Sequence, residues 1–153
     1  MLELPHTLVG AAIATQVETP WVALPLALAS HFALDLVPHW NPHLYSEMEK
    51  YGKSTQKSRR LVAADATLSL ISGGLIAARA LPDIRQFILI LAACFMAVAP
   101  DVVEAPFFFL GARWKWLERL IDWQREHQGK AGVKVGLLTQ AVVIAICLGI
   151  IFI

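Results

Sequence analysis

The chain has 153 residues, of which 57% are hydrophobic and only 16% charged, and its formal net charge is +1. A soluble domain usually carries about 25% charged residues, and the mean hydropathy of +0.58 also argues against a soluble protein. The two cysteines each lie inside an apolar run, which argues against a disulfide framework or a zinc ribbon. We therefore expect one all-α integral membrane domain, residues 1–153, with four or five transmembrane helices.

The N-terminal part of the chain predicts two helices separated by a turn. The first is a short apolar stretch, residues 7–17, which we expect to begin as a helix at Pro5, a residue favoured in a first helical turn. It is short for a membrane span and is either a tilted or a re-entrant helix. Residues 18–20 then form a turn, and residues 21–37 form the next apolar segment.

Three longer apolar segments follow along the chain. They are residues 60–81, residues 84–110 and residues 133–153. At 1.5 Å per residue, about twenty helical residues cover the ~30 Å hydrocarbon core of a bilayer. Each of these segments is therefore long enough to cross a membrane.

Two polar connections carry most of the basic side chains. Residues 39–60 and 111–134 hold eleven of the thirteen Lys and Arg residues, and the other two, Arg79 and Arg85, flank a short turn. With five spans, both basic connections lie on the same side, which the positive-inside rule makes cytoplasmic. We expect a multi-pass protein with its N-terminus in the cytoplasm and its C-terminus outside.

The segment from Arg113 to His127 has the pattern of an interfacial amphipathic helix. Four apolar side chains line one side, two further tryptophans border it, and charges lie opposite. The apolar residues are Trp114, Leu117, Leu120 and Ile121, and the bordering tryptophans are Trp116 and Trp123. Tryptophan suits the membrane interface, so we interpret these rings as surface anchors.

Ionisable side chains lie inside the predicted spans. His31 and Asp35 are four residues apart and share a helix face, which His39 would continue one turn later. Asp101 and Glu104 are three residues apart and also share a face. The expected topology places all five toward the cytoplasmic side of the membrane.

Three further residues fall at the same expected depth. They are His6 in the first turn of the first helix, Asp65 near the start of its span, and His127 at the end of the surface helix. An ionised side chain in mid-membrane costs at least ~2.5–3.5 kcal/mol. Divalent metal ions would neutralise the carboxylates and bind imidazole nitrogens. The ligands are too many for one tetrahedral zinc, so we expect two or three ions, an arrangement suited to phosphate esters.

Two of these acids also have structural explanations. Asp101 follows Pro100 and can cap a new helical turn. Asp65 can form an ion pair with Arg59 or Arg60 at the interface. Each explanation is about as well supported by the sequence as metal ligation.

Three short motifs carry a resemblance to a known family. Residues 30–40, with the sequence SHFALDLVPHW, resemble the membrane-bound metal-dependent hydrolases, a bacterial and archaeal group of small multi-span proteins. Residues 5–10, PHTLVG, are similar to the early histidine motif of that group, and residues 100–104, PDVVE, to its later acidic motif. A more distant likeness is to zinc-dependent phospholipases C and single-strand-specific nucleases, which hold zinc clusters and cleave phosphodiesters.

The resemblance implies an enzyme of the prokaryotic cytoplasmic membrane. It would hydrolyse a phosphoester of a lipid or lipid-linked substrate with two or three divalent ions, zinc or alternatively manganese. The metal ligands would be His6, His31, Asp35, Asp65, Asp101 and Glu104. His39 or His127 would either ligate metal or act as a general acid.

Two other functions fit the same residues. Intramembrane acids and histidines also form ion pathways, which would make the chain a small membrane carrier. A metal can also simply hold helices together in a non-catalytic membrane protein. The basic residues show no aromatic base-stacking pattern between them, so we expect no nucleic-acid partner.

Overall fold

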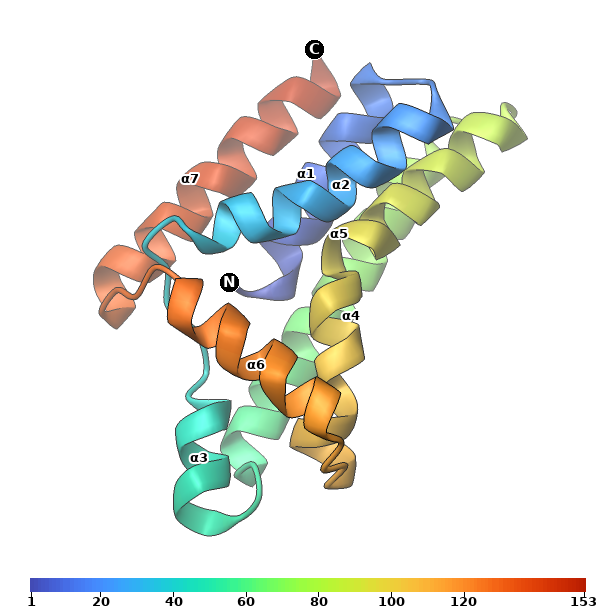
Figure 1. Cartoon of the computed structure of the whole chain (residues 1–153). Coiled ribbons are helices and arrows are strands. Elements are labelled where there is room, and N and C mark those ends of the chain that lie inside the picture. Colours follow the sequence, from blue (N-terminus) through green and yellow to red (C-terminus); the bar gives the residue numbers. More distant parts are fainter.

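The computed structural model describes all residues, 1–153, and consists of seven helices (Figure 1). There is no β-strand, only an isolated bridge between His39 and Lys130. The helices are α1 (Glu3–Gln16), α2 (Pro20–Asp35), α3 (Leu44–Tyr51), α4 (Gln56–Ala78), α5 (Ile84–Leu110), α6 (Lys115–His127) and α7 (Val133–Phe152). The predicted all-α class is confirmed.

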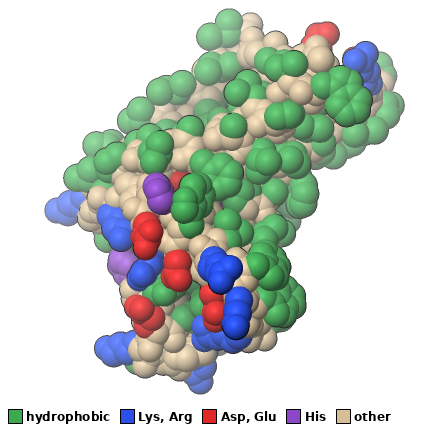
Figure 2. Space-filling view, viewed as in Figure 1, with side chains coloured by type: hydrophobic (Ala, Val, Ile, Leu, Met, Phe, Trp, Pro, Cys, Tyr) green, Lys and Arg blue, Asp and Glu red, His purple; other side chains and the backbone are tan.

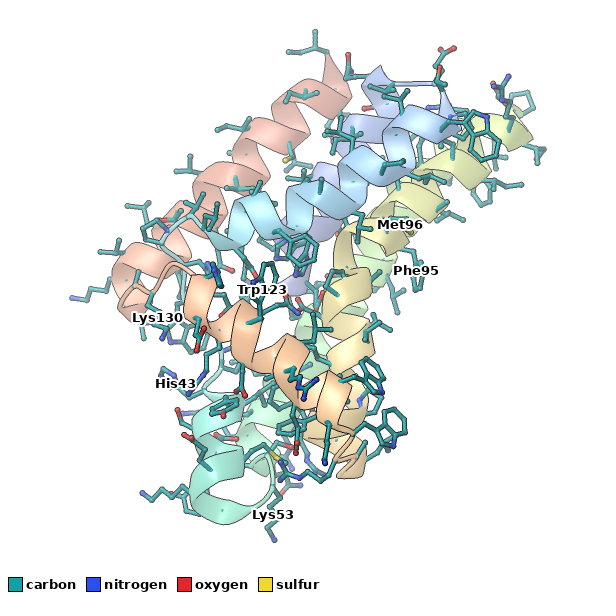
Figure 3. All side chains as sticks on the ribbon, viewed as in Figure 1. His43, Lys53, Phe95, Met96, Trp123 and Lys130 are labelled. Atoms are coloured by element: carbon teal, nitrogen blue, oxygen red, sulfur yellow. The ribbon has the colours of Figure 1, made fainter.

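Three helices, α4, α5 and α7, are long and apolar enough to cross a membrane. Only 17–33% of the residues in their most apolar stretches are buried. Large apolar side chains therefore point outward, as Phe95 does from α5 (Figure 3). An apolar surface of this extent is not expected on a soluble monomer and suits a lipid environment. The structure supports three of the four or five predicted spans.

Charged side chains gather at one end of the molecule. Figure 2 shows hydrophobic side chains over most of the visible face, whereas charged ones concentrate where α3 and α6 lie in Figure 1. Helices α1, α4 and α7 begin toward this end, and α2 and α5 end toward it (Figure 1). The histidines and acids predicted to lie at one depth in the membrane are thus on helix segments at the same end of the bundle.

Helix α1 lies at the centre of the bundle and packs against α2, α4, α5 and α7. Its buried positions include Gly10, Ala11, Ala12 and Ala14. A Cβ added to Gly10 would lie only 2.5 Å from the carbonyl oxygen of Ala93 on α5. Small residues let helix backbones approach closely, which lipid-embedded bundles use for packing. The small residues of α1 therefore allow four helices to surround it.

Two structural explanations offered by the sequence are wrong. Asp101 does not cap a new helix, because α5 continues without interruption from Ile84 to Leu110. No ion pair joins Asp65 to Arg59 or Arg60. Both acids point instead toward the cavity described below.

Helix α6 begins two residues later than predicted. Part of its apolar face packs against α3 and α5 and is not free to contact lipid. Leu117 and Ile121 are buried in a small cluster with Phe107 of α5 and Met48 of α3. Trp123 contacts Phe32 of α2 edge-to-face (Figure 3). The three tryptophans of this region remain about half exposed: Trp114, Trp116 and Trp123. The tryptophans therefore stay available as interface anchors, whereas the leucine and isoleucine hold α6 to the bundle.

The predicted continuation of α2 through His39 is wrong. The helix ends at Asp35, because Val37 precedes a proline, and residues before proline disfavour helical geometry. The following loop pairs with the loop after α6: His39 N donates to Gly129 O, and Ala131 N donates to His39 O. A Cβ on Gly129 would overlap the backbone of residues 36 and 37.

The close packing of this loop predicts that replacing two glycines of α7 by alanine has different effects on stability. A Cβ on Gly136 would overlap the backbone at Trp40, whereas one on Gly149 would meet open space. We expect Gly136→Ala to cost about 1–3 kcal/mol of stability through overpacking, and to lower the thermal midpoint measured in detergent. Gly149→Ala is the matched control and should leave the midpoint unchanged or raise it slightly, since Ala favours helix. Equal midpoints for the two variants would contradict this packing.

Candidate metal centre

Three helices bring histidines and carboxylates together beside the start of α1. His6 comes from the first turn of α1, His31 and Asp35 from the last turns of α2, and Asp101 from α5. At 1.5 Å per residue, Asp101 lies about 26 Å along α5 from Ile84. The hydrocarbon core of a bilayer is ~30 Å thick. If α5 enters the membrane at Ile84, Asp101 lies near the opposite edge of that core and not at its middle.

His31 is fully buried and presents its Nε2 atom to two carboxylates. Its Nδ1 lies 2.8 Å from the carbonyl oxygen of Ala97. A carbonyl only accepts, so Nδ1–H donates, and Nε2 is the ring atom left to bind a metal ion when it carries no proton. This Nε2 has no hydrogen-bond partner and lies 3.6 Å from Asp35 Oδ2 and 3.8 Å from Asp101 Oδ1.

These separations are too long for hydrogen bonds but suit ligands that share an ion. Zinc bonds of about 2.0–2.2 Å in a tetrahedron place neighbouring ligand atoms about 3.3–3.6 Å apart. Two carboxylates that face a buried imidazole nitrogen need nearby positive charge, which either a metal ion between them or a proton on the ring supplies. A carbonyl that fixes the tautomer of a histidine is also the usual support of a metal ligand.

His6 completes this arrangement from α1. It is fully buried and stacks on His31 with ring centroids 4.2 Å apart and an interplanar angle of 21°. Neither of its ring nitrogens has a hydrogen-bond partner, and Nε2 lies 3.4 Å from Asp35 Oδ1. One ligand atom each of His6, His31 and Asp101 lie within 4.8 Å of one another. These three residues fit a divalent ion bound by nitrogen and oxygen.

The closest partner of Asp35 is itself a cation. The α-ammonium group of Met1 donates to Asp35 Oδ1 at 2.6 Å, and Gln128 Nε2 donates to Oδ2 at 3.2 Å. The Asp35 side chain is only 7% exposed, and a buried carboxylate needs a compensating charge. The Met1 ammonium therefore supplies positive charge directly to Asp35.

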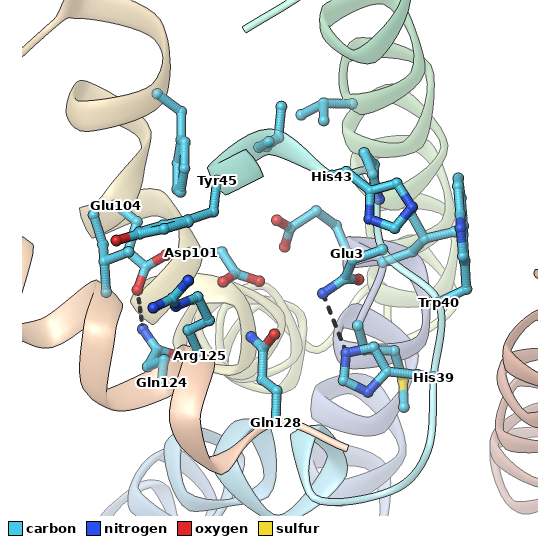
Figure 4. A pocket seen from close by; sticks show the side chains of 18 of the residues that line it. Glu3, His39, Trp40, His43, Tyr45, Asp101, Glu104, Gln124, Arg125 and Gln128 are labelled. Carbon is cyan, nitrogen blue, oxygen red and sulfur yellow. Dashed lines mark hydrogen bonds between the residues drawn. The ribbon is translucent and has the colours of Figure 1, made fainter. Parts of the chain in front are cut away.

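A cavity of about 380 Å³ lies beside the cluster (Figure 4). Asp101 lines it while also facing His31, and its side chain is 22% exposed. His6 and His31 lie behind Asp101, outside the lining. The ionisable lining residues are Glu3, His39, His43, Tyr45, Asp65, Asp101, Glu104, Arg125 and Lys130. Asp101 is thus the link between the buried histidines and the space open to a ligand.

Asp65 and Glu104 line the cavity but already hold hydrogen bonds. Asp65 accepts from Glu3 N at 2.6 Å and from Leu4 N at 3.4 Å. It therefore caps the start of α1 from a different helix, satisfying amides that have no partner within α1. Glu104 Oε1 accepts from Gln124 Nε2, which ties α5 to α6. Both carboxylates hold the elements that form the site in place.

His39 reaches the cluster from the loop after α2. Its Nδ1 donates to Val37 O at 2.8 Å, and its Nε2 lies 3.7 Å from Asp35 Oδ1 and 3.1 Å from Asn41 Nδ2. Burial lowers the pKa of His39 below its ordinary value, and the Met1 ammonium lowers it further. The ring is therefore neutral near pH 7, which suits a ligand or a base better than a general acid.

The structure does not bring His127 to the cluster. The side chain is exposed, its Nδ1 donates to the carbonyl of Trp123 one turn earlier at 2.7 Å, and it does not line the cavity. The ring also packs against that of Trp123, with centroids 4.9 Å apart. Its neighbours Gln124 and Gln128 reach the site instead.

Sequence reasoning missed several residues that reach the site, among them Glu3, Gln124, Arg125 and Gln128. Glu3 carries a signal that could have identified it, because it lies three residues before His6 on the same face of α1. The other three carry none, because their place at the cavity depends on how α6 docks against α5.

No family model, curated protein or solved structure matches the chain. Nothing among known proteins thus links it to the hydrolases that its motifs resemble. The chemistry available to the site is therefore inferred from its own residues.

The buried histidine nitrogens predict metal binding. We expect the detergent-purified protein to retain at least one zinc or manganese ion per chain after dialysis against the metal, measured by elemental analysis. His31→Ala should weaken binding at least tenfold, since loss of a ligand should cost at least as much as loss of a supporting contact, about 10–100-fold. His127→Ala removes an exposed histidine outside the cluster and should bind as the wild type does. Equal metal content in the two variants would contradict the site.

Proposed function

We propose that the chain is a membrane-embedded metal-dependent hydrolase that cleaves a phosphoester of a lipid or lipid-linked substrate. The observation that carries the proposal is the buried His6–His31 pair, whose free ring nitrogens face Asp35 and Asp101 beside an acid-lined cavity. Zinc fits these ligands first and manganese second. Two or three such ions, when bound, neutralise phosphate oxygens and make hydroxide available near neutral pH.

The residues divide between holding metal and shaping the site. His6, His31 and Asp101 would hold the first ion, with Asp35 beside them. Glu104, with one carboxylate oxygen free of Gln124, is the best placed acid for a further ion at the cavity wall. Asp65, whose two oxygens each accept an amide of α1, would chiefly fix the position of His6.

Two observations favour a catalytic site over the alternatives. A purely structural metal is fully enclosed by ligands, whereas a catalytic one keeps an open position. Here Asp101 borders a cavity large enough for a substrate headgroup. Against a carrier, none of the buried polar or charged side chains lies in residues 8–30, 70–100 or 141–153, which form the part of the bundle remote from the cavity. A pathway would need polar groups along the length of the bundle.

The proposal includes five spans, with the site at the cytoplasmic face of a prokaryotic cell membrane. Helices α1 and α2, of 14 and 16 residues, would cover about 21 Å and 24 Å of the membrane. Both pack against the long helix α5. Since eleven of the thirteen Lys and Arg residues lie in the two polar connections, that end would face the cytoplasm.

This orientation predicts which positions are reachable from outside the cell. In a variant lacking the buried Cys94 and Cys147, we expect Asp83→Cys to react with a membrane-impermeant maleimide in intact cells. Lys53→Cys and Arg119→Cys should react only after the membrane is permeabilised, because the basic connections are retained inside. Labelling of all three positions from the same side would exclude five spans.

Phosphoester hydrolysis is the direct test of the activity. We expect the zinc- or manganese-supplied protein to release phosphate or a phosphorylated headgroup from phospholipid in mixed micelles. Asp101→Asn should lower kcat by more than about 100-fold, because changing a ligand costs more than changing its supporting contact. Glu126→Gln alters an exposed acid of α6 outside the cavity and serves as the control. Equal activity of the two variants would contradict the role of Asp101 as a metal ligand.

A further inference from the structure

Arg125 of α6 is a cation on the wall of a cavity lined by four carboxylates. Figure 4 shows its guanidinium group reaching into the same space as Asp101 and Glu104. The Arg125 guanidinium carbon lies 4.0 Å from the ring centroid of Tyr45, which also lines the cavity. The hydroxyl of that tyrosine donates to Asp122 Oδ1 at 3.1 Å. A cation–π contact of this kind directs the guanidinium without using its N–H donors.

The charge of Arg125 is not paired within the protein. No carboxylate oxygen lies within 4.0 Å of its guanidinium nitrogens, although four acids line the cavity. On the same connection, Arg113 does form an ion pair, with Glu118 at 3.9 Å. A guanidinium presents five N–H donors in a planar fork that matches phosphate oxygens. Arg125 therefore has N–H donors free to bind a ligand in the cavity. The acids that line the same cavity could bind cations.

We infer that Arg125 binds the non-bridging oxygens of a phosphate group held in this cavity. The inference rests on the proposed function and deepens it, because it assigns the residue that recognises the phosphate. The carboxylates alone would repel an anion, so a phosphate needs positive charge on both sides. A metal ion held at His6, His31 and Asp101 would supply positive charge on one side, and Arg125 supplies it on the other.

The rest of the lining favours a phosphate that belongs to a lipid. Three apolar side chains from α4 and α5 line the same cavity: Val62, Phe108 and Phe109. These helices are two of the three that can cross a membrane. An amphiphile can place its phosphate against Arg125 and its acyl chains along this apolar wall. Free phosphate can make only the contact with Arg125.

The experiment compares two ligands on the full-length, metal-supplied protein in detergent. Calorimetry measures binding of inorganic phosphate and of phosphatidic acid in mixed micelles, and elemental analysis of the same samples gives their metal content. We expect Arg125→Gln to weaken both ligands at least tenfold with the metal content unchanged, since charged hydrogen bonds are lost. Arg119→Gln removes the same charge from an exposed position of α6 outside the cavity and should bind both ligands as the wild type does.

A second variant tests the source of the phosphate. Phe109→Ala should weaken phosphatidic acid binding and leave inorganic phosphate binding unchanged, since only the lipid contacts the apolar wall. An effect on neither ligand would overturn the lipid assignment. Wild-type affinity of Arg125→Gln for phosphate, or its loss of bound metal, would overturn the role of Arg125. So would the absence of phosphate binding to the wild type.

The two proposals fail in different ways in these measurements. Phosphate binding that depends on Arg125, with bound metal but without hydrolysis of any phosphoester, would support the phosphate site and reject the hydrolase. Hydrolysis that survives Arg125→Gln with unchanged KM and kcat would reject the phosphate site and keep the hydrolase.

Discussion

The structure depends on positive charge that compensates the carboxylates of Asp35 and Asp101, which lie close together inside the helical bundle. Asp35 is almost completely buried, and Asp101 faces it across the Nε2 atom of His31. Isolated charges in such a place are costly, and the Met1 ammonium, 2.6 Å from Asp35 Oδ1, compensates the charge of that carboxylate. The packing of α1 serves this end, because its small residues let α2, α4, α5 and α7 close around the first turn that carries His6.

Local patterns in the sequence predicted the long helices and the shared face of two candidate site residues well. The bounds of α5 and the beginning of α7 agree with prediction, because uninterrupted apolar runs end at clear polar boundaries. The spacing of His31 and Asp35 placed both on one face, as observed. The number of spans is less well determined by sequence, since α1 and α2 are short and derive their position from surrounding helices.

Features created by tertiary contacts could not be predicted from the sequence. His39 reaches Asp35 through a loop that pairs with residues 129–131, and the closeness depends on a glycine almost a hundred residues away. Asp65 looked like a ligand or an ion-pair partner, yet both its oxygens accept amides of α1. The arrangement of α6 also decides which of its polar residues meet the cavity. Apolar periodicity identifies the helix but not the neighbour on which it docks.

One turn of α5 holds two parts of the centre at once. Ala97 fixes the orientation of His31 through its carbonyl, and Asp101 follows it four residues later, one turn along the helix. Pro100 lies between them and has no backbone N–H, which weakens the helix locally. Bending at this turn would shift the acid and release the imidazole together. The geometry of the candidate centre is therefore coupled to the curvature of α5, so that in a membrane the bilayer thickness or lateral pressure acting on this helix would change the spacing of His31 and Asp101.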